Sequence, residues 1–328
     1  MIKHSRQQIR LLYHWWNDDL SVKPHKDLAN PIILSIATVR AHNWSIPITV
    51  IDVSSEERKE DWKEYSSILN FNVVHLKPLL DQNLHKSSRL CSRVWDIWAY
   101  SQLVKENNIL FTDCDIFWIK NPLPLSKANN ERLDDFYCSS NTGVWYFDKR
   151  SERVKKTIQL WKSIISNVLI GDKDFYDDLS EIVPSAKQFF QDEVAFGYLI
   201  LKYPELYSPV DVYENFIVDR LRYTEYDFNK IKAIHMLSAT LGQMRGRVCL
   251  ILSELKRSLE KIFSKEQIDD IFNGVNSETE YSVDDVKSIS SKELRDFVSF
   301  TGNSGCHIPN VKPSDNYGYF VKELGIDQ

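Results

Sequence analysis

The stretch "NNILFTDCDIFWIKNPLPL" (Asn107–Leu125) decides how the rest of the chain is interpreted. It begins with an apolar run, Ile109 to Phe111, that predicts a buried strand. Two carboxylates follow, Asp113 and Asp115, with a single residue between them, and then the chain becomes apolar again. Two neighbouring carboxylates repel each other unless a cation or hydrogen-bond donors offset their charge. Acids at the end of a core strand therefore need a physical reason.

A metal site is one such reason. Residues two apart on an extended chain point to the same side, so Asp113 and Asp115 can face one ligand. Oxygen ligands at a partly open site suit Mg²⁺ or Mn²⁺, and such ions commonly bridge to substrate phosphates. The alternative is a surface turn whose acids merely cap a following helix, because D-x-D pairs are common in sequences.

Strand and helix patterns alternate before this stretch. Apolar runs predict strands, and helical spacing or capping signals predict helices; the strands are Pro31–Val39, Ser45–Val53 and Phe71–Leu76, and the helices are Ser54–Leu69 and Ser87–Asn107. This alternation predicts an α/β fold with a mostly parallel sheet covered by helices. Ligands of such sheets collect beyond the carboxyl ends of the strands, which is where Asp113 and Asp115 are expected.

Composition narrows the class of protein. The chain has 328 residues, of which 43% are hydrophobic, so it can bury a sizeable core and is not globally disordered. Its net charge of -5 argues against a general nucleic-acid binder, which carries a basic surface. The five cysteines are scattered and odd in number, which predicts reduced thiols rather than a disulfide framework or a metal-binding set.

The first twenty residues contain no continuous apolar leader segment. Leu11, Leu12, Trp15 and Trp16 predict an apolar face on an N-terminal helix. We expect this face to pack on the protein's own core, with contact to a membrane surface as the alternative. No apolar run is long enough to span a bilayer, so a soluble, cytoplasmic protein is expected.

The strand, the D-x-D pair, the apolar run and "NPLPL" together resemble the GT-A-type glycosyltransferases, nucleotide-sugar enzymes that include glycogenin and related retaining transferases. The resemblance spans about Pro31 to Thr240 and implies a Rossmann-like, mostly parallel sheet. It also implies a divalent metal, Mn²⁺ or Mg²⁺, held on the donor's diphosphate by Asp113 and Asp115. His235, at the end of a late strand in "KAIHML", matches the family's third metal ligand.

Further segments in the family's order imply residues that bind the donor. "SIAT" (Ser35–Thr38) resembles the nucleotide-contacting segment, the helix before D-x-D carries a basic residue, and "NTGVWYFDK" resembles the N-x-G strand beside the sugar. The implied donor-binding residues are Ala37, Thr38, Arg89, Arg93, Asp113, Asn141 and Gly143. Each also has an ordinary structural alternative: a buried strand end, a solvated helix face or a turn.

The chain departs from the family at two places. Retaining members follow the histidine with a glycine and later a lysine that holds the diphosphate; here Ser238 replaces the glycine, and Arg245 is a candidate for the positive charge. Where the family commonly has Asp-Gln at a helix start, this chain has Asp192-Glu193, which implies a carboxylate near the oxocarbenium-like reaction centre. The resemblance favours retention and a UDP-sugar donor, whereas inversion would require one of these acids to act as a base.

Two other classes of protein fit parts of the sequence. A haloacid-dehalogenase-like phosphohydrolase also uses a strand and D-x-D, and Val168–Asp178 is similar to that family's later acidic motif. Against this class, several strands precede the D-x-D pair and Phe117 stands where the family has Thr or Val. The other class is a non-catalytic nucleotide-sugar or glycan-binding protein built on the transferase fold.

We expect a GT-A domain with an N-terminal helix over residues 1–244, followed by a helical extension over residues 245–328. Within the extension, Cys249–Val275 predicts two short amphipathic helices and Ser290–Phe300 predicts another. The extension could cover the donor site, bind the acceptor, form a homodimer or simply pack on the domain. The expected partners are a UDP-sugar donor and a saccharide or glycoconjugate acceptor.

Overall fold

The computed structural model describes ten segments of the chain, and at a few positions within them it describes the backbone alone. These segments are residues 9–16, 31–77, 88–123, 136–138, 142–182, 191–206, 208–210, 212–217, 230–235 and 257–271. Asp113 and Asp115 of the predicted D-x-D pair lie within the third of these segments.

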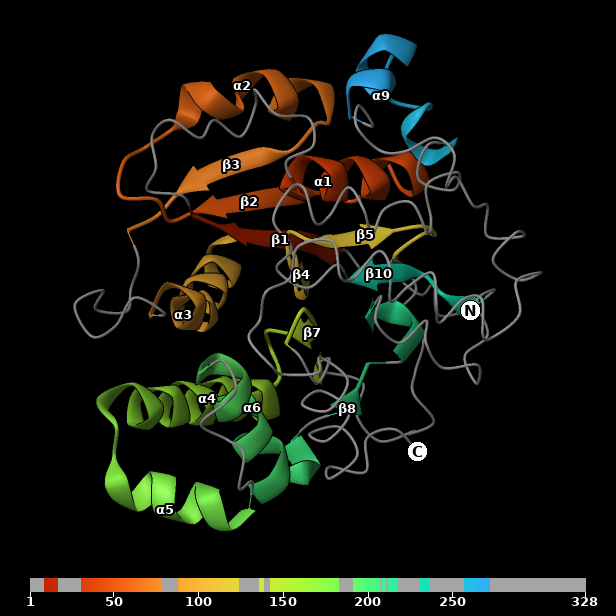
Figure 1. The fold of residues 1–328 in the computed structure, drawn as a ribbon. Coiled ribbons are helices and arrows are strands. Elements are labelled where there is room, and N and C mark those ends of the chain that lie inside the picture. Colours follow the sequence, from red (N-terminus) through yellow and green to blue (C-terminus); the bar gives the residue numbers. More distant parts are fainter. Residues whose placement is uncertain are drawn as a thin grey trace, which may run out of the picture.

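A seven-stranded sheet runs through the centre of the molecule in the order β3-β2-β1-β4-β7-β6-β8 (Figure 1). Its strands are β1 (Ile9–Trp15), β2 (Ile48–Asp52), β3 (Asn72–His75), β4 (Asn108–Thr112), β6 (Phe136–Cys138), β7 (Val144–Asp148) and β8 (Ser208–Pro209). Among the described pairings, β7 is antiparallel to both neighbours and every other pair is parallel. The predicted α/β fold with a mostly parallel sheet is therefore confirmed.

The N-terminal segment was predicted as a helix, and this prediction is wrong. Residues Ile9–Trp15 form β1, which lies between β2 and β4, with Leu11 opposite Ile48 and Leu12 opposite Phe111. A strand in the middle of a parallel sheet is covered on both faces, so its sequence shows no alternation of polar and apolar residues. Without that alternation, a short apolar run is as compatible with a helix as with a strand.

The opposite error occurs at residues 31–39, which were predicted as a strand and form the helix α1 (Pro31–His42). Residues Ile32 to Arg40 are all buried, because α1 lies between the sheet and other parts of the chain. A helix buried on all sides has no polar stripe and reads as a continuous apolar run. Proline at its first position is compatible with a helix, since the first turn needs no amide donor there.

Helices cover both faces of the sheet (Figure 1). On one face lie α1 and α2 (Lys59–Ile68), whose buried residues Trp62 and Tyr65 join the same hydrophobic core as Leu11 and Leu110. On the other face lie α3 (Ser88–Leu103), α4 (Glu152–Ile170) and α6 (Gln191–Lys202), with α5 (Lys173–Ile182) beyond α4. The helix predicted from Ser54 thus begins later, with Arg58 at the N-cap position.

A line of aromatic rings fixes the second layer against the sheet. The ring of Phe111 in β4 lies 4.7 Å from that of Trp145 in β7, Trp145 lies 4.6 Å from Trp161 in α4, and Trp161 lies 4.7 Å from Phe196 in α6. Offset or tilted aromatic pairs at these distances stabilise a core beyond simple area burial. The middle of α6 is therefore connected to β4 through β7 and α4.

A second, three-stranded sheet lies beside the carboxyl end of β4. It has the order β5-β10-β9 and consists of β5 (Ile116–Trp118), β10 (Ala233–His235) and β9 (Phe216–Ile217). Two hydroxyl groups of α1 hold β5: Ser35 donates to the carbonyl of Ile116, and the amide of Trp118 donates to Thr38 Oγ1 at 3.0 Å. The chain that leaves the D-x-D pair is thus held by α1 through these two bonds and by β10 through strand pairing.

Residues 257–271 of the expected extension pack against α1. Leu259, Phe263 and Ile268 belong to the same hydrophobic core as α1, and Ser258 Oγ lies 3.2 Å from His42 Nε2. Within the region where two helices were predicted, the structure describes α9 (Lys265–Ile271) and, before it, a helical segment at residues 257–259. The predicted helix over 290–300 and most of the extension lie outside the described residues, so the boundary at residue 244/245 stays a prediction.

Among the described helices, we find none with the length and apolar character needed to cross a lipid bilayer.

Candidate metal centre

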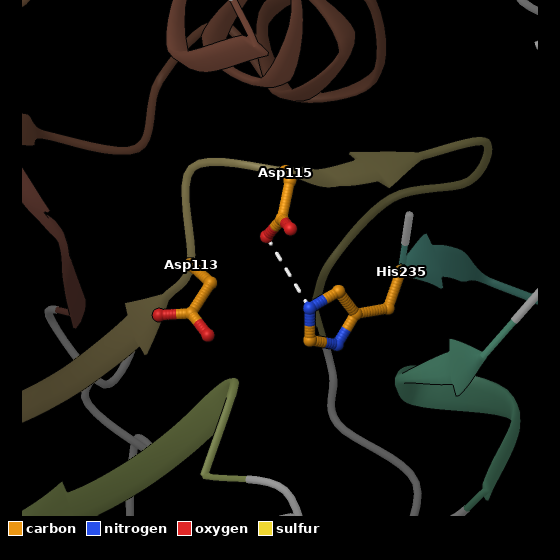
Figure 2. Close-up of side chains that lie close together, drawn as sticks. All are labelled: Asp113, Asp115 and His235. Atoms are coloured by element: carbon orange, nitrogen blue, oxygen red, sulfur yellow. Dashed lines mark ion pairs between the residues drawn. The ribbon is translucent and has the colours of Figure 1, made fainter. Parts of the chain in front are cut away.

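Three side chains from separate parts of the chain converge beyond the end of β4 (Figure 2). One potential ligand atom each from Asp113, Asp115 and His235 lies within 4.8 Å of the other two. Asp113 follows β4, Asp115 precedes β5, and His235 ends β10. The sequence analysis predicted these three residues as a set, and the structure brings them together.

The position follows from the topology of the sheet. From β1 the chain continues to β2 and β3 on one side, and β4 lies on the other side of β1, so strand order reverses between β1 and β4. Ligands of open α/β sheets bind beyond the carboxyl ends of the strands at such a reversal. Asp113 follows the carboxyl end of β4 directly, so its carboxylate lies at this point.

The small sheet explains why His235 meets Asp115. In the antiparallel pair of β10 and β5, His235 lies opposite Ile116, the residue after Asp115. As a result His235 Nε2 lies 3.3 Å from Asp115 Oδ1, and the imidazole is buried while the carboxylate stays partly exposed at 15%. The other ring nitrogen, Nδ1, lies 3.0 Å from Asn215 Oδ1. Since a carbonyl oxygen can only accept, Nδ1 donates this bond.

Arg93 of α3 is the predicted basic residue that reaches the site. Its Nη1 donates to Asp113 Oδ1 at 2.8 Å, and its Nη2 donates to Thr142 Oγ1. The guanidinium also lies 5.8 Å from the ring centroids of both Phe111 and Trp145. Charge-assisted hydrogen bonds and aromatic faces together hold this cation in one orientation beside Asp113.

The loop that enters β7 closes the site from a third side. The amide of Asp113 donates to the carbonyl of Gly143 at 2.8 Å. A Cβ atom on Gly143 would stand 2.9 Å from His235 Cε1 and 3.2 Å from Asp113 Oδ2, so a side chain here would displace two of the three converging residues. Before it, Thr142 adopts φ 56°, a conformation that β-branched residues rarely take and that often occurs at functional sites.

Cys114, between the two acids, is not oriented as a ligand. Its Sγ lies 3.3 Å from the carbonyl of His14, to which it donates. Burial and the neighbouring charges of Asp113 and Asp115 raise the pKa of the Cys114 thiol well above its usual range. The residue therefore stays a neutral thiol, and a thiolate ligand is not available from it.

The three converging residues fit a hard divalent cation. Ligand atoms about 2.1 Å from Mg²⁺ stand roughly 3 to 4 Å from one another, so the observed spacing needs only a small adjustment. Asp115 Oδ1 and His235 Nε2 face each other, and because Nδ1 donates to Asn215, the neutral form of this imidazole carries its lone pair on Nε2. Two facing acceptors are stable where a cation lies between them.

The structure corrects one pair of predicted donor-binding residues. Ala37 and Thr38 were placed at a strand end, but they lie inside α1 with fully buried side chains, and Thr38 Oγ1 bonds the backbone of β5. The strand that ends beside the site is β1, at Trp15. The segment "SIAT" therefore packs against β5 and holds its backbone by hydrogen bonds, while the side chains of Ala37 and Thr38 are buried in the core.

The remaining predicted residues are placed in part. Arg89 lies on α3, one turn before Arg93, and Asp192 and Glu193 lie in the first turn of α6; the structure describes the backbone alone at these three positions. Asn141 and Arg245 lie outside the described residues. Their roles toward a donor stay predictions.

Sequence reasoning missed two residues of the site. Asn215 contacts His235 across 20 positions, and Thr142 holds Arg93. Neither residue lies in a spacing that signals a ligand, although Thr142 is part of the segment that resembles N-x-G. Only the pairing of β10 with β9, in which His235 lies opposite Ile217, explains why Asn215 is near the imidazole.

The sequence matches no protein-family model and no curated protein. Solved structures do match. The glycosyltransferase GlyE of Streptococcus pneumoniae TIGR4 is 12% identical, with a TM-score of 0.43 over 70% of this chain; the match covers 55% of the GlyE chain, so this chain spans little more than half of it.

Two further matches cover nearly the whole of the other chain. Mouse xyloside xylosyltransferase 1, in its apo form, is 14% identical with a TM-score of 0.42 over 70% of this chain and 98% of its own. The galactosyltransferase LgtC, solved with donor and acceptor sugar analogues, is 11% identical with a TM-score of 0.45 over 80% of this chain and 99% of its own. All three matches are glycosyltransferases, the class that the motifs resemble.

Proposed function

We propose that this protein is a metal-dependent glycosyltransferase that moves a sugar from a nucleoside-diphosphate sugar to a saccharide or glycoconjugate acceptor. The observation that carries the proposal is the convergence of Asp113, Asp115 and His235 where strand order reverses, with Arg93 beside them. Two carboxylates and one imidazole, with one arginine, make a site suited to a divalent cation and a diphosphate.

Glycosyl transfer of this kind requires positive charge beside the nucleoside diphosphate that leaves the sugar. When a sugar leaves a nucleoside diphosphate, negative charge develops on the phosphate oxygens, and Mn²⁺ or Mg²⁺ held by Asp113, Asp115 and His235 would offset it. Arg93 is already oriented toward this position through Asp113 and Thr142. A fixed cation stabilises developing charge better than a mobile one, because no reorganisation is needed during the reaction.

An acid is required on the sugar side. Asp192 and Glu193 lie in the first turn of α6, and Phe196 in the same helix packs on Trp161 of α4. We propose that one of them stabilises the oxocarbenium-like centre, as expected for retention of configuration. For the nucleotide we propose uridine, and for further contacts to the donor we propose Arg89, Asn141, Gly143 and Arg245.

The structure does not support the second motif of the phosphohydrolase alternative, residues 168–178. Residues 168–178 were similar to a strand followed by glycine and spaced aspartates, but the structure places them at the end of α4, at Gly171 in a left-handed C-cap with φ 68°, and in α5. Aspartates on α5 follow a helix and not a strand end, so this segment does not resemble that family in three dimensions.

Thermal unfolding tests the proposal. The protein is heated with UDP or GDP, each with and without Mn²⁺, because a ligand of the folded state raises the unfolding midpoint by mass action. We expect stabilisation by UDP that requires Mn²⁺ and is absent in Asp115→Ala, followed by transfer or slow hydrolysis from one member of a UDP-sugar panel. Stabilisation without turnover of any donor would favour a binding protein, and no response to either nucleotide would contradict the donor class.

A further inference from the structure

The second nitrogen of His235 has a partner whose role goes beyond the three converging residues. Asn215 Oδ1 accepts a hydrogen bond from His235 Nδ1 at 3.0 Å, and both residues are buried, at 6% and 4% exposure. We infer that Asn215 is a positioning residue that keeps His235 Nε2 directed at the cation between Asp113 and Asp115. The inference rests on the proposed metal site and concerns how that site is kept in order.

Two ring arrangements compete with the one observed. Rotating the imidazole by half a turn about the Cβ–Cγ bond would place Cε1 where Nε2 lies, and carbon would then face Asp115. Moving the proton from Nδ1 to Nε2 would remove the lone pair from the side of the cation. The bond to Asn215 Oδ1 opposes both changes, since only a nitrogen that carries a proton can donate to a carbonyl oxygen.

Packing alone does not distinguish these arrangements. The edge of the ring formed by Nδ1 and Cε1 also meets Gly143, where a Cβ would stand 2.9 Å from Cε1 and 3.1 Å from Nδ1. This contact restricts the plane of the ring, but the flipped ring has nearly the same shape. The choice of nitrogen must therefore come from a polar partner, and Asn215 provides it.

Asn215 is itself held in place by its neighbours. It lies between the 3₁₀ turn η3 (Val212–Glu214) and β9. Lys232 Nζ donates to the fully buried Glu214 at 2.7 Å, and the amide of Lys232 donates to the carbonyl of Tyr213 at 2.8 Å. Because Lys232 directly precedes β10, these contacts fix the turn that presents Asn215 relative to the strand that presents His235.

The experiment measures Mn²⁺ affinity without relying on turnover. The full chain, freed of metal, is titrated with Mn²⁺ while the electron paramagnetic resonance signal of free Mn²⁺ is followed. Asn215→Ala removes the acceptor, and Asn215→Asp keeps an acceptor of the same shape. Loss of a hydrogen-bonding partner behind a metal ligand typically weakens metal binding about 10- to 100-fold, and we expect this of Asn215→Ala. Asn215→Asp is expected to bind Mn²⁺ at least as tightly as the wild type.

Asn108 provides a matched control. It is also a buried asparagine, its Oδ1 also accepts one side-chain hydrogen bond, from Tyr146 at 2.8 Å, and it lies at the start of β4, away from Asp113. Asn108→Ala should lower the unfolding midpoint and leave the Mn²⁺ affinity of the folded protein unchanged. If Asn215→Ala does not fold, Asn215→Ser, whose side chain is too short to reach Nδ1, takes its place.

The outcomes separate this inference from the proposed function. Unchanged Mn²⁺ affinity in the alanine or serine variant would overturn the role of Asn215 while leaving the metal site in place. A loss in Asn108→Ala equal to that in Asn215→Ala would also overturn it, because the effect would then follow from stability alone. If the wild type itself does not bind Mn²⁺, the metal site fails and the inference fails with it.

Discussion

Within the described segments, two aspartate–histidine pairs have similar geometry and different surroundings. In one, His14 Nε2 lies 3.0 Å from Asp96 Oδ2, and both side chains are buried, with exposures of 2% and 0%. In the other, His235 Nε2 lies 3.3 Å from Asp115 Oδ1, with exposures of 6% and 15%. The distance between carboxylate and imidazole therefore does not tell a structural pair from a ligand pair.

The difference lies in what else the two carboxylates meet. Asp96 Oδ2 also accepts from Ser92 at 2.8 Å, so donors surround it inside the core. Asp115 has a second carboxylate, Asp113, nearby, and the three potential ligand atoms share one small space. Buried polar groups are stable when donors and acceptors match, whereas a cluster of acceptors indicates a place for a cation.

The largest expected effect comes from removing Asp115, the carboxylate of the partly exposed pair with His235. In Asp115→Ala, Mn²⁺-dependent stabilisation by UDP should disappear, and turnover should fall about a thousandfold or more, since a metal ion contributes several kcal/mol to stabilising transition-state charge. The unfolding midpoint without ligands should change little or rise, because a repulsive pair is removed. Calorimetry with and without UDP and Mn²⁺ checks this, and retained Mn²⁺-dependent stabilisation would remove Asp115 from the site.

The fully buried pair of Asp96 and His14 should respond in the opposite way. Asp96→Ala leaves the buried His14 Nε2 without the carboxylate oxygen that it contacts, and a buried polar group left without its partner costs roughly 1 to 3 kcal/mol. Urea unfolding in the presence of a chelator measures this loss. The folded fraction should still bind Mn²⁺ with wild-type affinity. A selective loss of metal binding in Asp96→Ala would mean that the two pairs are not independent.

Gly143 lies against His235 and Asp113, and a substitution there is expected to have a smaller effect than the loss of Asp115. In Gly143→Ala the new Cβ would stand 2.9 Å from His235 Cε1, so the ring or the loop must move. Overpacking of this kind costs about 1 to 3 kcal/mol, and a displaced ligand should weaken Mn²⁺ binding as well. Ser151, outside the site, gives a matched control for a small change in size: Ser151→Ala should affect the start of α4 and leave Mn²⁺ binding unchanged.

A third histidine gives the smallest expected effect. His42 contacts Ser258, and burial, helped by the charge of Lys261, lowers the pKa of His42 below its ordinary value of 6.5. The unfolded chain therefore binds more protons just below pH 6.5, so stability should be lost as pH falls through that value toward the pKa of the folded protein. In His42→Gln this part of the acid-side loss should be absent from unfolding curves. An identical pH profile in the variant would show that His42 does not contribute.

The sequence was sufficient to predict the alternating fold and the three converging residues. Apolar runs with clear boundaries predicted β2, β3 and β4, and the D-x-D pair with a late histidine predicted which three side chains converge. It failed at β1 and α1, because elements buried on every side lose the polar residues whose spacing distinguishes strand from helix. Asn215 could not be found either, since its contact depends on the pairing of two short strands that are distant in sequence.

The line of aromatic rings gives the protein an optical property. Trp145 lies 4.6 Å from Trp161 at an interplanar angle of 51°, and the cation of Arg93 lies 5.8 Å from the Trp145 ring. Two indoles this close couple their electronic transitions, and a neighbouring charge shifts the energy of the excited state. A ligand that draws Arg93 toward itself should therefore alter near-ultraviolet circular dichroism and tryptophan emission, so that occupancy of the site can be followed without a label.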